Sequence, residues 1–95
     1  MLAQARQDRL SAFCRSHGIR RAALFGSLAR GEGRSDSDID LLVTFDAPKS
    51  LLSVVRLERE LGKELGRKVE LLTEEAISPH IRRRIAPDLT VIYES

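Results

Sequence analysis

The sequence predicts an α/β domain in which helices pack on a mixed sheet of four strands. Segments with apolar residues at helical spacing alternate along the chain with short strand-like runs. Glycine or proline separates most of these segments, as is typical of turns. The chain has 95 residues, 42% of them hydrophobic, which is enough for one domain with a modest core. Alternation of this kind favours helices that cover a sheet.

The predicted elements follow the order helix, strand, short helix, strand, helix, strand, short helix, strand. They are expected at residues 3–17, 19–25, 27–31, 38–45, 51–65, 68–73, 80–85 and 89–93. Serine at a helix start accepts a backbone hydrogen bond, and glycine or proline ends a helix. The expected caps are Ser27, Ser50 and Ser78, and the expected stops are Gly18, Gly66 and Pro87.

Apolar spacing also predicts which faces are buried. Residues three or four apart share a helix face, and every second residue shares a strand face. The first helix is expected to bury Leu10, Phe13, Cys14 and His17, and the long central helix Leu51, Val54, Leu57, Leu61 and Leu65. In strand 38–45, Ile39, Leu41, Val43 and Phe45 face one way, and Asp38, Asp40, Leu42 and Thr44 face the other. Two carboxylates are therefore expected on the second face.

Composition excludes several classes of protein. The 16 Lys and Arg residues nearly balance the 14 Asp and Glu, so a nucleic-acid site would need a local basic patch, such as Arg20, Arg21 and residues 82–84. The few aromatic residues count against a surface that stacks bases. No apolar run is long enough to cross a bilayer, and no secretory signal is recognisable. A single cysteine, Cys14, fits a reducing compartment, so we expect a cytoplasmic protein without a membrane partner.

Asp38 and Asp40 form the first candidate for chemistry. Two residues apart on a strand, their carboxylates lie on one face and repel each other unless a cation lies between them. Oxygen ligands of this kind favour Mg²⁺, whose remaining ligands are often waters and substrate phosphates. Two such ions can hold the attacking and the leaving oxygen of a phosphoryl displacement. An isolated Asp-x-Asp is more often a polar strand start, so the pair needs support from elsewhere.

Gly26 and Ser27 supply that support, at the corner between a strand and a short helix. Glycine lets the backbone approach a ligand closely, and the free N–H groups of the helix start attract anions. The Ser27 hydroxyl can add a hydrogen bond. Taken alone, the pair reads as a tight turn and a helix cap. A phosphate cradle and a metal pair together suit a nucleoside triphosphate.

This arrangement resembles the minimal nucleotidyltransferases of the DNA polymerase beta superfamily, whose signature is Gly-Ser, ten residues, then Asp-x-Asp. Here Gly26-Ser27 is followed by the ten residues 28–37 and then by Asp38-Ile39-Asp40. The segments Arg30-Gly31 and Leu65 to Leu72 are also similar to the family, and the resemblance covers most of the chain from Ile19 onward. It implies a nucleotidyltransferase fold, with a four-stranded mixed sheet, helices mainly on one face and an open catalytic face. We expect residues 1–95 to form a single domain, with an N-terminal helix in 1–18 and the catalytic core in 19–95.

The resemblance also implies roles for individual residues. Gly26 and Ser27 would hold the triphosphate of ATP, and Asp38 and Asp40 would hold two Mg²⁺ ions. The family has a third carboxylate, usually Asp, that helps to activate the acceptor hydroxyl, and Glu70 stands at the matching position. Glu70 is expected to be a catalytic carboxylate and metal ligand; the alternative is a solvated strand residue paired with a nearby base.

Arg30 and Arg34 flank the loop between the two motifs. Arginine suits bidentate contact with phosphate oxygens, so both are expected to bind the nucleotide, against the alternative of solvated loop charges.

The expected activity is transfer of AMP from ATP to an acceptor hydroxyl, with release of pyrophosphate. By the same resemblance, the acceptor would be a tyrosine of a HEPN-type helical toxin, and the chain would act as its antitoxin. A second hypothesis is an antitoxin that binds nucleotide or partner without catalysis, which the glutamate at position 70 favours. A third is nucleic-acid binding through the basic patch, which would show a steep loss of affinity with added salt.

Overall fold

The computed structural model describes residues 3–33 and 37–95. The elements are α1 (Gln4–Ser16), β1 (Ile19–Phe25), α2 (Gly26–Ala29), β2 (Ile39–Phe45), α3 (Leu51–Leu65), β3 (Val69–Thr73), α4 (Pro79–Ile85), the 3-10 turn η1 (Ala86–Asp88) and β4 (Thr90–Glu94). The predicted order of helices and strands is confirmed. The expected end of the fourth helix before Pro87 is confirmed: α4 ends at Ile85, and η1 follows with Pro87 in its first turn, where the missing N–H is tolerated.

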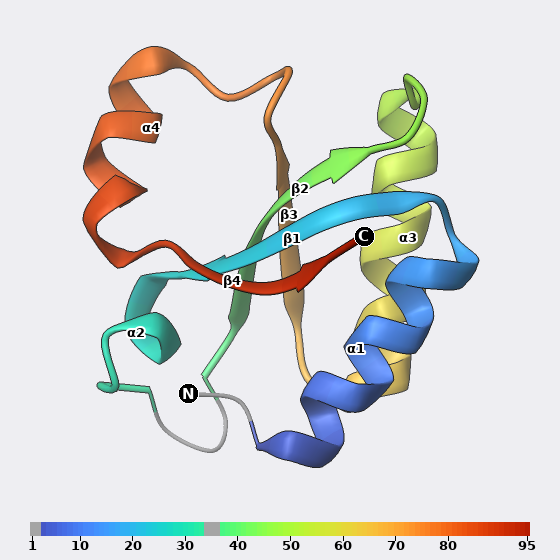
Figure 1. The fold of residues 1–95 in the computed structure, drawn as a ribbon, viewed down its shortest axis with the longest axis horizontal. Coiled ribbons are helices and arrows are strands. Elements are labelled where there is room, and N and C mark those ends of the chain that lie inside the picture. The colour runs from blue at the N-terminus through green and yellow to red at the C-terminus, as the bar shows by residue number, and fades with distance from the viewer. Residues whose placement is uncertain (1–2, 34–36) are drawn as a thin grey trace.

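The four strands form one mixed sheet in the order β3-β2-β1-β4, as Figure 1 shows. β1 runs antiparallel to β2 and β4, whereas β2 and β3 are parallel. The parallel pair requires a crossover, and α3 supplies it. The sheet therefore places the end of β1 beside the starts of β2 and β3.

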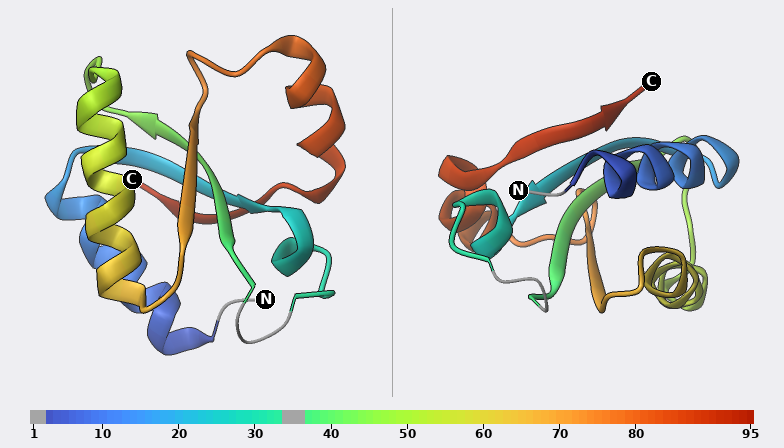
Figure 2. Two further views of the ribbon diagram at one scale, coloured as in Figure 1. Left: turned by 180° about the vertical axis from the view of Figure 1, so that it is seen from behind. Right: turned by 90° about the horizontal axis from the view of Figure 1, so that it is seen from below.

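The core lies between the sheet and the two long helices, α1 and α3, which pack on the same face (Figure 2). The core side of β2 consists of Ile39, Leu41 and Val43, as the alternation predicts, and Phe45 packs against it. The helices contribute Leu10, Phe13, Cys14, Val54, Leu57, Leu61 and Leu65. The α/β class, the mixed sheet and the placement of the long helices are confirmed.

Two residues expected in the buried stripes lie outside the core. Leu51 is 79% exposed, because it starts the first turn of α3 and lines a cavity instead of joining the core. His17 is only half-buried: it follows α1, stacks on the Phe13 ring at 3.9 Å between centroids and places Nε2 3.4 Å from Glu60. Burial weakens at both positions because each lies at a helix end.

The helix ends mostly follow their sequence signals. The Ser50 and Ser78 hydroxyls accept hydrogen bonds from backbone N–H groups at 3.1 and 3.2 Å, and Gly66 ends α3 with a φ of 67°. The expected cap at Ser27 is wrong. Phe25 takes the N-cap position of α2 and Ser27 lies within the helix, because β1 turns directly into α2 at Gly26, whose φ is +78°.

Cys14 and the apolar segments can be located in the fold. Burial raises the pKa of the Cys14 thiol to about 12, so this cysteine is a packed apolar group and not a nucleophile. In the part of the chain that the structure describes, no helix has the length and apolarity that a membrane crossing requires.

Candidate active site

Three of the predicted residues meet at one end of the sheet, where β1 stops and β2 and β3 start. Phe25, the last residue of β1, pairs with Asp40 of β2, and Asp40 pairs with Glu70 of β3. Gly26 follows Phe25 directly and begins α2. The sheet register therefore brings together residues that are far apart in the sequence.

Gly26 packs directly against the carboxyl group of Asp40. A Cβ atom at position 26 would lie 3.3 Å from Cγ of Asp40 and would overlap its Oδ2. The φ of +78° is a second reason for glycine, because side chains disfavour this left-handed region. The corner is therefore shaped so that the backbone of the Gly-Ser motif approaches the carboxylate closely.

Asp40 lies among other acidic side chains at this end of the sheet. The pKa of Asp40 is raised from 3.8 to about 6, first by burial and then by a hydrogen bond from the protonated Asp40 to Glu70. The negative charges of Glu70 and Asp38 add to this shift, while the positive charge of Arg30 opposes it. The sheet end thus holds more negative charge than it can stabilise alone, which is a favourable setting for a cation.

We predict that the raised pKa of Asp40 is measurable in the cation-free protein. Between pH 3.8 and about 6 the folded chain keeps a proton on Asp40 that the unfolded chain has released. The stabilising contribution is fully present below the lower value and is lost as the pH rises through the higher one. An NMR titration of the Asp40 carboxyl carbon should give a pKa of about 6, and Glu70→Gln should lower it. A wild-type midpoint at the ordinary Asp value would contradict the raised pKa of Asp40.

The carboxylates of Asp40 and Glu70 are suitable ligands for a hard divalent cation, although they do not form a complete metal site by themselves. Asp40 and Glu70 supply carboxylate oxygens at adjacent positions, the ligand type that Mg²⁺ favours. Within residues 3–33 and 37–95, however, no three acidic, His or Cys side chains are already arranged around a common metal position. Asp38 is exposed and lies just before β2, and its negative charge acts on Asp40.

The chain that leads into β2 is anchored by a residue that the sequence reading did not single out. Nε of Arg67 donates a hydrogen bond to the backbone carbonyl of Ser37 at 2.9 Å. Next along the chain from Asp38, the Ile39 N–H donates to the carbonyl of Lys68, also at 2.9 Å. Arg67 therefore anchors the backbone beside Asp38.

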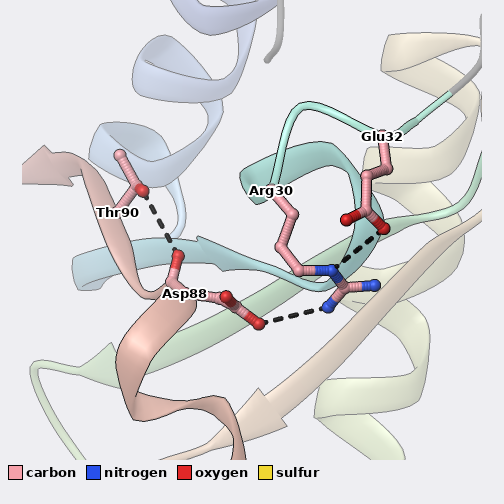
Figure 3. Close-up of polar contacts among 4 residues, drawn as sticks. All are labelled: Arg30, Glu32, Asp88 and Thr90. Carbon is pink, nitrogen blue, oxygen red and sulfur yellow. Dashed lines mark hydrogen bonds and ion pairs between the residues drawn. The ribbon is translucent and has the colours of Figure 1, made fainter.

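Arg30 lies at the same end of the molecule, at the C-terminal end of α2. Figure 3 shows its guanidinium between Asp88 and Glu32, and its charge acts on Asp40. Arg34, the other arginine expected to bind nucleotide, lies outside the described residues. Ser27 is half-buried in the first turn of α2, and its backbone carbonyl accepts the N–H of Glu32 at 2.9 Å.

The basic patch considered for nucleic acid is partly neutralised. Arg21 lies 3.8 Å from Glu74 and 3.6 Å from Glu94, and Arg82 forms an ion pair with Glu74. These pairs lower the local positive charge on which phosphate binding depends. The structure therefore gives the nucleic-acid hypothesis no additional support.

A mixed sheet with a glycine corner and facing carboxyl groups at one end defines a nucleotidyl-transfer domain. The family described as "Nucleotidyltransferase domain" matches residues 8–92, and the chain belongs to this family. Within it the chain is a minimal nucleotidyltransferase.

The relatives agree with this assignment. A Methanocaldococcus jannaschii protein assigned by name to the protein adenylyltransferases is 51% identical over 69 residues, which cover 73% of this chain and 74% of that protein. The solved structure of a protein named as a minimal nucleotidyltransferase is 38% identical, with a TM-score of 0.75, and the match covers 92% of this chain and 89% of that one. A structure of a tri-AMPylated Shewanella oneidensis HEPN toxin in complex with an MNT antitoxin matches at 17% identity with a TM-score of 0.78, covering 97% and 72%. The last likeness shows the fold alone.

Proposed function

We propose that this chain, as a single domain spanning residues 1–95, is a protein adenylyltransferase that moves AMP from ATP to a tyrosine hydroxyl of a HEPN-type toxin. In this way it would act as the antitoxin of its partner. The observation that carries the proposal is the sheet end at which Gly26 packs on Asp40 and Asp40 lies in register with Glu70 on the neighbouring strand. The relative named as a protein adenylyltransferase and the AMPylated toxin bound to an MNT antitoxin support the choice of acceptor.

In this proposal the Gly-Ser corner holds the triphosphate. Gly26 leaves room for close approach, and the Ser27 hydroxyl and the N–H groups that begin α2 are the donors for phosphate oxygens. Arg30 adds a positive charge at the same end, and Arg34 is proposed to do the same from the loop that follows. These contacts would orient the α-phosphorus toward the carboxyl pair.

Asp38, Asp40 and Glu70 are proposed to hold two Mg²⁺ ions, which would neutralise phosphate charge and favour loss of the acceptor proton. In the transfer step, the acceptor oxygen forms a bond to the α-phosphorus, and the bond from the α-phosphorus to the bridging oxygen breaks. Pyrophosphate leaves with that oxygen. Glu70 is exposed and reaches one methylene further than Asp, so we assign it the additional role of accepting the hydroxyl proton.

A direct transfer assay tests the proposal. The purified chain is incubated with Mg²⁺, ATP labelled at the α-phosphate and a purified HEPN-type protein from the same genome. The expected result is covalent label on a tyrosine of the partner, with one pyrophosphate released for each label. ATP labelled at the γ-phosphate should leave the partner unlabelled. Absence of label on a partner that binds the chain would contradict transfer.

Two observations favour a second candidate, a non-catalytic antitoxin. Among the described residues the three carboxylates are not already gathered around one metal position, and glutamate stands where the family resemblance implies aspartate. Under this alternative the chain would neutralise its partner by binding it. A variant that lacks the carboxylates would then protect cells as well as the wild-type chain does.

A further inference from the structure

The ion pair between Arg30 and Asp88 joins the two ends of the catalytic core, as Figure 3 shows. Nη1 of Arg30 donates to Oδ2 of Asp88 at 3.1 Å, across a separation of 58 residues. Nε of the same guanidinium donates to Oε1 of Glu32 at 3.3 Å. Arg30 follows the helix that begins at the Gly-Ser corner, whereas Asp88 belongs to η1.

The two carboxylates differ in how firmly they are held. The Asp88 side chain is 25% exposed, against 65% for Glu32. Two hydrogen bonds stabilise the backbone turn around Asp88: the Leu89 N–H donates to the carbonyl of Ala86, and the Thr90 hydroxyl donates to the carbonyl of Asp88, both at 3.3 Å. β4, which begins at Thr90, then pairs with β1. Asp88 is therefore a fixed acceptor, and Glu32 is a solvated one.

We propose that Asp88 is a positioning residue for nucleotidyl transfer, which holds the Arg30 guanidinium where it meets the phosphates of the bound nucleotide. The inference rests on the proposed function, since it takes ATP as the substrate. In Figure 3 the dashed lines reach Nε and Nη1 of Arg30. The hydrogen bonds to Glu32 and Asp88 therefore use these two nitrogens and not Nη2. Arg30 is also near enough to Asp40 for its charge to act on that carboxyl group. A phosphate group beside Asp40 would thus meet a guanidinium that is already oriented.

A positioning role and a purely structural one predict different kinetics. Arginine is flexible, and pre-orientation reduces the rotamer entropy that is lost when it binds phosphate. Asp88→Asn keeps the shape of the side chain and removes its charge. We expect it to raise the KM for ATP about tenfold, the usual size of a lost charge-assisted contact, with kcat changed less than about twofold. Asp88→Glu should restore most of the wild-type KM, and Glu32→Gln should change KM less than Asp88→Asn does, because its carboxylate is solvated.

Two comparisons make the experiment decisive. Asp46→Asn removes the same charge from an exposed position after β2 and serves as the matched control, with wild-type KM expected. In an Arg30→Gln background, Asp88→Asn should cause no further rise in KM, since Asp88 acts through Arg30. If Asp88→Asn instead lowers the melting temperature while KM stays at the wild-type value, or if the two substitutions raise KM independently, the positioning role is overturned. A wild-type chain that neither binds ATP nor transfers AMP overturns the proposed function itself.

Discussion

Replacing Asp38 and Asp40 together by asparagine is expected to lower AMP transfer about 10³-fold or more, while the chain stays folded. Asparagine keeps the size of each side chain but cannot supply the negative charge that draws a divalent cation to the sheet end. The free energy of unfolding should not fall. A neutral side chain at position 40 removes both the repulsion between negative charges and the cost of burying a charge, the two effects that raise the pKa of Asp40. The measurement is the initial rate of label transfer, together with a thermal melt of each protein.

The matched control for this variant is Asp8→Asn with Asp46→Asn, which removes two negative charges from exposed positions away from the carboxyl pair. It should transfer AMP at the wild-type rate. Persistent transfer by the Asp38/Asp40 variant would refute the assigned roles of both carboxylates. Loss of transfer with full protection against the toxin would instead identify binding as the basis of neutralisation.

Gly26→Ala is the second substitution with a large expected effect. The new Cβ would overlap Oδ2 of Asp40 and lie 3.3 Å from its Cγ, so the carboxyl group must move. Displacement of a reacting group by about 1 Å can cost about a hundredfold in rate, and we expect at least that loss in kcat/KM. The left-handed φ adds a stability loss of about 1–2 kcal/mol.

Gly31→Ala separates these two contributions. Gly31 has a φ of +75°, close to the +78° of Gly26, but its Cβ would meet no atom within 4 Å. The variant should therefore lose about the same 1–2 kcal/mol of unfolding free energy and keep its activity when assayed well below its melting temperature. Equal losses of activity in both variants would show that backbone strain, and not the contact with Asp40, explains the requirement for glycine.

Much of the fold was predictable because its signals are local. The serine caps at Ser50 and Ser78, the glycine at Gly66 and the alternation along β2 depend only on neighbouring residues. The prediction that Leu51 is buried is wrong, because helical spacing indicates which side of a helix is apolar but not how far the sheet beneath it extends. The prediction that Ser27 caps a helix is wrong, because β1 continues without a linker into α2 and Phe25 therefore occupies the N-cap position.

The site was predictable in part for the same reason. Gly26, Asp38 and Asp40 lie within one short segment, and their spacing indicates their chemistry. The position of Glu70 beside Asp40 depends on the parallel register of β2 and β3, which no local pattern specifies. The role of Asp88 cannot be predicted from the sequence, because it depends on the position of η1 beside Arg30 in the folded chain.

The pairing of β4 with β1 has a consequence for how the protein is made. β1 is the third strand in the sheet order and lies between β2 and β4, although β4 is synthesised after β1, β2 and β3. During translation the Gly-Ser corner and all three carboxylates leave the ribosome before residues 88–94 do. Contacts between such distant segments form slowly and only once both are available. A ribosome-bound chain that stops short of β4 would therefore have the carboxylates but lack the edge of the sheet and the acceptor that orients Arg30. Competence for transfer is thus expected to arise late, at or after completion of the β4 segment.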